Sequence, residues 1–182
     1  MKNLIEYIKE GLKITSKTKV NERPKYNYHP KTNKELQDLL KQLIKERGNE
    51  GNFNDIDTSE IKDMSNLFDG IDKFNGDISN WDVSNVTDMY SIFYGCKSFN
   101  RSLAKWKVFN VTNMEFMFYE CESFNQPLNK WDMSNVINTK FMFFGCKSFN
   151  RDISQWDVSK VIRKEFMFEH CPIEEKYQPK FK

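Results

Sequence analysis

The stretch FNGDISNWDVSNVTDMYSIFYGCKSFN, residues 74–100, sets the architecture of this chain, because related versions of it follow at a period of 25 residues. Columns of Trp, Phe, Asn and Cys all keep this register without an insertion. The tryptophans are Trp81, Trp106, Trp131 and Trp156, and the cysteines are Cys96, Cys121, Cys146 and Cys171. Several coincident columns at one period indicate a repeat protein in which each unit packs on its neighbours.

Two hydrophobic periods follow one another within the unit. Trp81 and Val83 lie two residues apart, which is typical of side chains that face inward from a short strand. Met89, Ile92 and Phe93 have the i, i+3, i+4 spacing of a short helix. We therefore expect an α/β repeat: a right-handed, leucine-rich-repeat-like solenoid with one short parallel strand and one short helix per 25-residue unit.

The repeat divides the chain into three parts. We expect a helical N-terminal segment and cap at residues 1–52, a solenoid of about five units at 53–171, and a C-terminal tail at 172–182. In the first part, Leu4, Ile5, Ile8 and Leu12 predict a short amphipathic helix. Thr32 and Glu35 form a capping box for a second helix, which Gly48 should end.

The motif Phe-Asn…Trp-Asp-Val-Ser-Asn-Val-Thr-x-Met…Phe-x-x-Cys-x-x-Phe-Asn resembles the 25-residue unit of the BspA-type leucine-rich repeat surface proteins. The resemblance covers about residues 53–171. It implies a non-enzymatic protein of a mostly secreted or surface-attached family that binds host or bacterial partners.

The residues offer little for catalysis or metal binding. The cysteines are 25 residues apart, whereas zinc and redox sites use pairs spaced by two to four residues, so we expect buried thiols. His29 and His170 are the only histidines, and neighbouring side chains such as His170 and Cys171 point apart. The sequence therefore predicts no catalytic residues, no metal and no cofactor.

Charge and targeting patterns constrain the class of partner. Charged residues interrupt the first twenty positions, where a signal peptide needs an apolar run, and no membrane span is present. As written, the sequence predicts a cytoplasmic protein. A basic segment could attract nucleic acid, although no recognised module accompanies it. Its basic residues are Lys13, Lys17, Lys19, Arg23, Lys25, Lys31 and Lys34.

Exposed positions that vary between units are the best candidates for function. On the predicted strand face, Lys107 replaces the recurrent Asp and should pair with Asp82 and Asp132, and Phe109 replaces a Ser. The candidate residues on this face are Asp82, Lys105, Lys107, Phe109, Lys130, Asp132 and Asp157.

The predicted helix side departs further from the consensus. Phe116, Phe141 and Phe166 occupy one column outside the inward stripe, and Tyr119 and Phe144 belong to a second such column. Stacked units would join these rings into a continuous apolar strip, which on a water-soluble protein usually marks a contact. Either a partner covers this strip, or the first helix or the tail Tyr177–Phe181 does.

These patterns predict a non-catalytic protein–protein interaction module whose partner the sequence does not identify. The first alternative is a self-associating structural or assembly protein, for example one encoded by a phage or mobile element, with a homo-oligomer formed through the strip. The second, less favoured alternative is nucleic-acid binding through the basic N-terminal segment.

Overall fold

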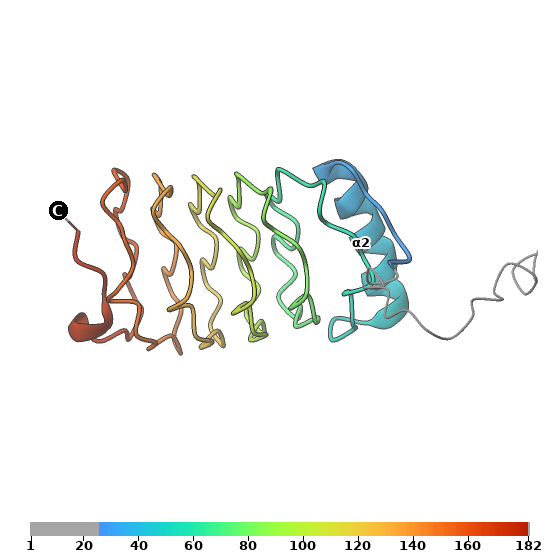
Figure 1. The fold of residues 1–182 in the computed structure, drawn as a ribbon. Coiled ribbons are helices and arrows are strands. Elements are labelled where there is room, and N and C mark those ends of the chain that lie inside the picture. Colours follow the sequence, from blue (N-terminus) through green and yellow to red (C-terminus); the bar gives the residue numbers. More distant parts are fainter. Residues whose placement is uncertain (1–25, 182) are drawn as a thin grey trace, which may run out of the picture.

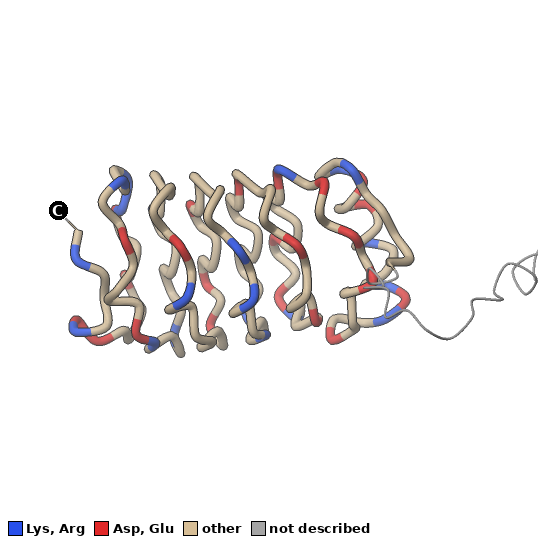
Figure 2. The backbone as a smooth tube through the Cα atoms, viewed as in Figure 1, with Lys and Arg blue, Asp and Glu red and all other residues tan. Residues whose placement is uncertain are grey.

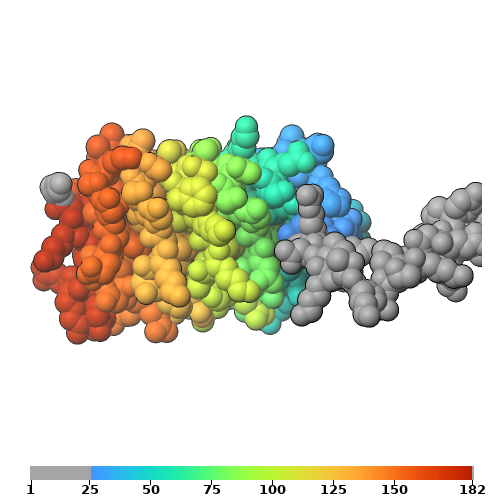
Figure 3. Space-filling view, in the orientation of Figure 1, coloured from blue at the N-terminus to red at the C-terminus, as the bar shows by residue number. Residues whose placement is uncertain are grey.

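The computed structural model of the chain describes residues 26–181. This range holds one α-helix, α2 (Asn33–Arg47), and one short 3-10 helix, η1 (Glu175–Tyr177), and it holds no strand. Between the two helices, successive 25-residue coils of chain lie side by side (Figure 1). They pack in consecutive bands along the long axis of the molecule (Figure 3). The amphipathic helix expected near the N-terminus lies outside the described residues.

The expected leucine-rich-repeat solenoid of strand-plus-helix units is wrong. At the expected strand, the N–H of Trp81 donates to the carbonyl of Ile78, and that of Val86 to Val83, so the chain forms tight turns there. Parallel pairing between units is limited to isolated single-residue bridges, which are too short to make strands. Along one side they join Asp63 to Asp88, Asp88 to Asn113, Asn113 to Asn138, and Asn138 to Arg163.

The expected helix is absent from the unit because its backbone twice enters the left-handed region. In the second unit, Ser91 has φ 53° and Gly95 has φ 68°. An α-helix needs φ near −63° at every residue, so a left-handed residue in its centre interrupts it. The spacing of Met89, Ile92 and Phe93 correctly indicated three fully buried side chains, but it did not indicate the backbone that carries them.

In place of a helix, alternate backbone N–H groups of this segment donate to backbone carbonyls of the next unit. The intervening N–H groups close turns within the unit; that of Tyr94, for example, donates to the carbonyl of Ser91. From the second unit to the third, the bonds run from Met89 to Asn113, Ser91 to Glu115, Phe93 to Met117 and Gly95 to Tyr119, at 2.8–3.1 Å. Equivalent bonds join the other units, so four rows of peptide groups run along the stack with their N–H groups toward its C-terminal end.

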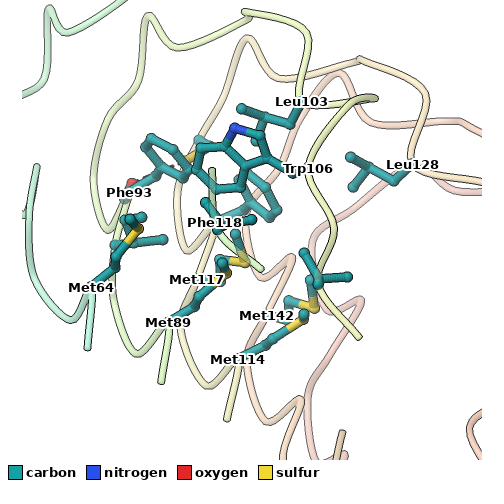
Figure 4. Close-up of a cluster of buried hydrophobic side chains, with 14 of the residues drawn as sticks. Met64, Met89, Phe93, Leu103, Trp106, Met114, Met117, Phe118, Leu128 and Met142 are labelled. Atoms are coloured by element: carbon teal, nitrogen blue, oxygen red, sulfur yellow. Dashed lines mark hydrogen bonds between the residues drawn. The ribbon is translucent and has the colours of Figure 1, made fainter. Parts of the chain in front are cut away.

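Stacked aromatic rings fill the interior of the coils. Phe118 stacks on Phe93 at 5.5 Å and on Phe143 at 5.4 Å between ring centroids, and all three side chains are fully buried. Trp106 lies beside Phe93 (Figure 4). Its indole N–H donates to the carbonyl of Ile78 at 3.2 Å. The units with Trp81, Trp131 and Trp156 repeat this arrangement, and Ile56 takes the place of Trp in the first unit, so the core is continuous from one end of the stack to the other.

The polar columns satisfy backbone groups. Cys121 is a buried free thiol that donates to the carbonyl of Phe93 at 3.0 Å. Burial raises the pKa of this thiol well above its ordinary value. In the Asn column, the side-chain oxygen of Asn75 accepts from the N–H of Asn100, and that of Asn100 from Asn125. Each column therefore repeats one hydrogen bond per junction between units.

Helix α2 is confirmed within the bounds that the sequence indicated. The hydroxyl of Thr32 accepts from the N–H of Glu35 at 3.2 Å, and Gly48 follows the helix with φ 76°. Its buried leucines, Leu36, Leu40 and Leu43, belong to the same core as the coils.

The polar side of α2 contacts the first coil through two side-chain amides. Asn33 donates to the carbonyls of Asp63 and Ser65, at 3.2 and 3.0 Å. Gln37 donates to the Ser65 carbonyl at 3.3 Å. These are the first carbonyls of two peptide rows, so α2 supplies the donors that a preceding unit would otherwise provide.

The C-terminal tail packs against the other end of the stack. The backbone carbonyl of Tyr177 accepts from the N–H of Ile153 at 3.0 Å. Ile173 and Pro179 are buried. The ring of Phe181 lies 4.7 Å from the ammonium of Lys164.

We expect Phe118→Ala to lower the free energy of unfolding by about 3–5 kcal/mol, because it leaves a cavity between two stacked rings. Phe109→Ser is the control, since Phe109 is 39% exposed and other units carry Ser at that position; it should change stability by less than about 0.5 kcal/mol. Chemical denaturation followed by tryptophan fluorescence measures both. Equal effects of the two substitutions would contradict a core built on the Phe column.

Candidate interaction surface

The structure brings the three unusual phenylalanines into one stack. Phe116 and Phe141 lie parallel with their ring centroids 5.1 Å apart, and Phe141 and Phe166 follow at 5.0 Å. They come from three successive coils and repeat at the spacing of the coils themselves. Phe166, at the end of the stack, is 55% exposed.

A second column runs beside the first. Tyr94, Tyr119 and Phe144 stack at 4.6 and 4.8 Å. Edge-to-face contacts join the columns, with 5.6 Å between Phe116 and Tyr119 and 5.7 Å between Phe141 and Phe144. We call these six residues the aromatic strip: Tyr94, Phe116, Tyr119, Phe141, Phe144 and Phe166.

The phenylalanines of the strip occupy a backbone conformation that disfavours them. Phe116, Phe141 and Phe166 have φ of 56–57°, whereas the equivalent residue of the first unit is Asn66, a type that tolerates this region. A left-handed conformation costs a residue with a Cβ about 1–2 kcal/mol. Backbone geometry therefore does not explain why phenylalanine stands at these three positions.

Residues 26–181 cover the strip only partly. Phe116, Phe141, Tyr119 and Phe144 are half-buried, largely by one another. The ammonium of Lys140 lies 5.3 Å from the centroid of the Phe141 ring, in cation–π range. Of the two intramolecular covers considered from sequence, the tail places Tyr177 beside Ile153 rather than on the strip, and the first helix lies outside the described residues.

The second candidate face is polar and differs from expectation. Within residues 26–181, Lys107 forms no ion pair with Asp82 or Asp132, so the predicted pairs are wrong. The two carboxylates instead accept the N–H groups of Ser84 and Ser134, each closing a local turn.

The recurrent Asp of this face therefore has a structural role. Hydrogen bonds from Ser134 lower the pKa of Asp132, and Asp157 accepts from the N–H of Ser159 in the same way. Lys105 donates to the Asn80 side chain, while Lys107 and Lys130 are exposed. Acidic and basic residues are interspersed along the coils (Figure 2), so this face shows no single-sign charge.

Both histidines and all four cysteines of the chain lie within the described residues. No group of three or more His, Cys, Asp or Glu side chains in residues 26–181 could hold a metal ion. His29 lies 3.3 Å from Asp57, far along the chain from any cysteine. Cys171, the least buried thiol, has its pKa raised by burial to about 11, which disfavours the reactive thiolate.

Comparison with known proteins gives one match. Residues 35–149 and 124–173 match the family model described as "Mycoplasma protein of unknown function, DUF285". Together the two matches span well over half of the chain. The chain belongs to the DUF285 family. This family is part of the BspA-like repeat-protein group. No curated protein and no solved structure matches the chain.

The DUF285 match includes α2 from Glu35 onward and every residue of the aromatic strip. Within the range that the structure describes, no helix is long and apolar enough to cross a membrane.

Sequence reasoning missed one exposed apolar pair in this DUF285 chain. Ile137 and Ile162 are 42% and 75% exposed, and the N–H of Ile162 donates to the Ile137 carbonyl, so the two are neighbours. Earlier units carry Thr87 and Thr112 in this column. The change from Thr to Ile was therefore visible as a break in the repeat pattern.

We expect Phe141→Asn to change the free energy of unfolding by less than about 1 kcal/mol, because relief of left-handed strain offsets part of the lost stacking. Phe143→Asn is the matched control, two residues away but fully buried, and should cost more than about 3 kcal/mol. Chemical denaturation of both variants makes the comparison. If Phe141→Asn is as damaging as Phe143→Asn, the strip is part of the core and not a surface.

Proposed function

We propose that this chain is a non-catalytic interaction module that binds a partner protein through the aromatic strip. The observation that carries the proposal is the conformation of Phe116, Phe141 and Phe166, which keep large rings at φ 56–57° where Asn or Gly would be unstrained. Unfavourable conformations at a partly exposed position are typical of functional sites. The strain is compensated if the rings supply binding energy to a partner.

The chemistry of the strip supports a protein as the partner. Aromatic residues dominate the energy of protein–protein contacts because they bury a large area with little side-chain freedom to lose. Here the rings are already ordered by stacking at 5.0–5.1 Å in one column and 4.6–4.8 Å in the other. A complementary partner would present aliphatic or aromatic side chains in a row along the stack.

The repeat motif supports the same class of function. We propose that the units are of BspA type, as the Trp-Asp-Val-Ser-Asn-Val motif suggests, and that α2 with the preceding residues caps the first unit. On this view residues 53–171 form the interacting body, and residues 1–52 and 172–182 flank it.

Self-association is the second candidate, and the regularity of the strip favours it. Equal ring spacing along three coils makes the strip complementary to a second copy of itself, as a two-fold contact requires.

The test compares the proteins that immobilised wild-type protein retains with those that a Phe116→Asn, Phe141→Asn double variant retains. We expect a partner bound by the wild type to bind the variant at least about 10-fold more weakly, because interface rings of this kind are often hot spots. Phe109→Ser, an aromatic removed from the other face, should leave binding unchanged.

Light scattering of the same three proteins separates the two candidates. If the wild type is an oligomer and the double variant is a monomer, the strip mediates self-association. A monomeric wild type excludes self-association. Partner binding that survives the double variant, together with a monomeric wild type, would overturn the proposal for the strip.

A further inference from the structure

The two ends of the stack are covered to different extents. At the fourth unit, Thr139 and Met142 are buried, and Phe143 is fully covered by the coil that follows. At the fifth unit, Glu165 and Phe166 are exposed, Phe168 is half-buried, and Met167 is buried. The tail packs against Ile153 and places Phe181 beside Lys164, so the part of the coil surface from Glu165 to His170 is less covered here than in the earlier units.

The preceding junctions show what fits on this surface. At each one, alternate N–H groups of a unit donate to carbonyls of the next unit. The bonds of the last junction run from Thr139 to Arg163, Phe141 to Glu165, Phe143 to Met167 and Gly145 to Glu169, at 2.8–3.0 Å. In the fifth unit the N–H groups of Phe166, Phe168 and His170 are at the same positions, and they donate to no backbone carbonyl within residues 26–181.

The orientation of the peptide rows makes this end a donor surface. The hydrogen bonds of these four rows all point the same way, so their dipoles add, as they do in a helix. The neighbouring column runs the opposite way, for example from the N–H of Ile162 to the carbonyl of Ile137. The N–H groups of the four rows, which carry the positive end of each dipole, point out of the C-terminal end. The matching group on a partner is an oxygen acceptor.

A second copy of this chain does not offer the required acceptors. In the four rows, its own C-terminal end presents N–H groups, which cannot pair with N–H groups. At its N-terminal end α2 packs on the first coil, and Asn33 and Gln37 already occupy two of the four row carbonyls, those of Asp63 and Ser65. The chemistry of both ends therefore favours a different polypeptide.

We propose that the C-terminal end of the stack binds a segment of a partner polypeptide, which adds to the peptide rows as a further coil of the chain would. The segment presents backbone carbonyls at alternate residues to the N–H groups of Phe166, Phe168 and His170. It also places apolar side chains on the rings of Phe166 and Phe168, as the fifth unit does on the fourth, where Phe143 and Phe168 stack at 5.9 Å. This mode resembles strand addition to a sheet edge. It does not depend on the strip binding a partner.

The probe is a fluorescent peptide of the sequence INTKFMFFG, residues 137–145, because the carbonyls of this segment already accept from the third unit at 2.8–3.0 Å. Binding to the full chain is followed by anisotropy and by amide hydrogen exchange. We expect the amides of Phe166, Phe168 and His170 to exchange rapidly in the free protein, and at least about 10-fold more slowly with saturating peptide. A scrambled peptide of the same composition should not protect them.

Two matched variants separate this end from the strip. Phe166→Asn removes the ring at the open end and should weaken peptide binding by about 2- to 10-fold, the range for one aromatic contact. Phe116→Asn makes the same change at the other end of the phenylalanine column and should leave peptide binding unchanged.

Three results would overturn the proposal: no binding of the peptide, binding that leaves the three amides unprotected, or equal weakening by both variants. Protection of the same amides by inorganic phosphate alone, without protection by the peptide, would also overturn it, because the end would then be an anion site. None of these results would alter the outcome of the partner test for the strip.

Discussion

Hydrogen bonding between peptide groups exactly one period apart is the constraint on which the molecule depends. Alternate N–H groups, such as those of Met89 and Ser91, reach carbonyls in the next coil at 2.9–3.0 Å. Such bonds form only if successive units have equal length, because one inserted residue would shift every donor in the segment from the next coil to its own turn. The strict 25-residue period is the consequence.

The side-chain columns follow from the same constraint. Once the backbones are in register, equivalent residues lie at the spacing between coils, which suits parallel aromatic rings and a relay of amide side chains. Phe93 and Phe118 stack at 5.5 Å, and Asn100 donates from its backbone to the Asn75 side chain at 3.0 Å. Each such contact contributes little by itself, about 0.5–1.5 kcal/mol for a ring pair or a hydrogen bond, but every junction repeats the set.

The alternation of bonds within and between coils also explains where the molecule can interact. A segment with left-handed residues such as Phe116 and Phe141 turns large side chains outward while keeping its N–H groups directed along the stack. The aromatic strip and the open C-terminal end are thus two results of one backbone arrangement. One presents side chains along the stack, and the other presents main-chain donors at its end.

The sequence alone determined the period, the buried columns and helix α2, because each depends on local chemistry or on identity at a fixed spacing. The capping box at Thr32 and the inward residues Met89, Ile92 and Phe93 are examples. Only the tertiary structure decided the backbone of the unit. A residue such as Ser91 has no strong intrinsic preference for φ 53°, and it adopts this angle because its N–H then reaches Glu115 in the next coil. The i, i+3, i+4 spacing reports which side chains face inward, and both a helix and a chain of tight turns can satisfy it. The difference lies in hydrogen bonds between residues 24 positions apart, which no local pattern contains.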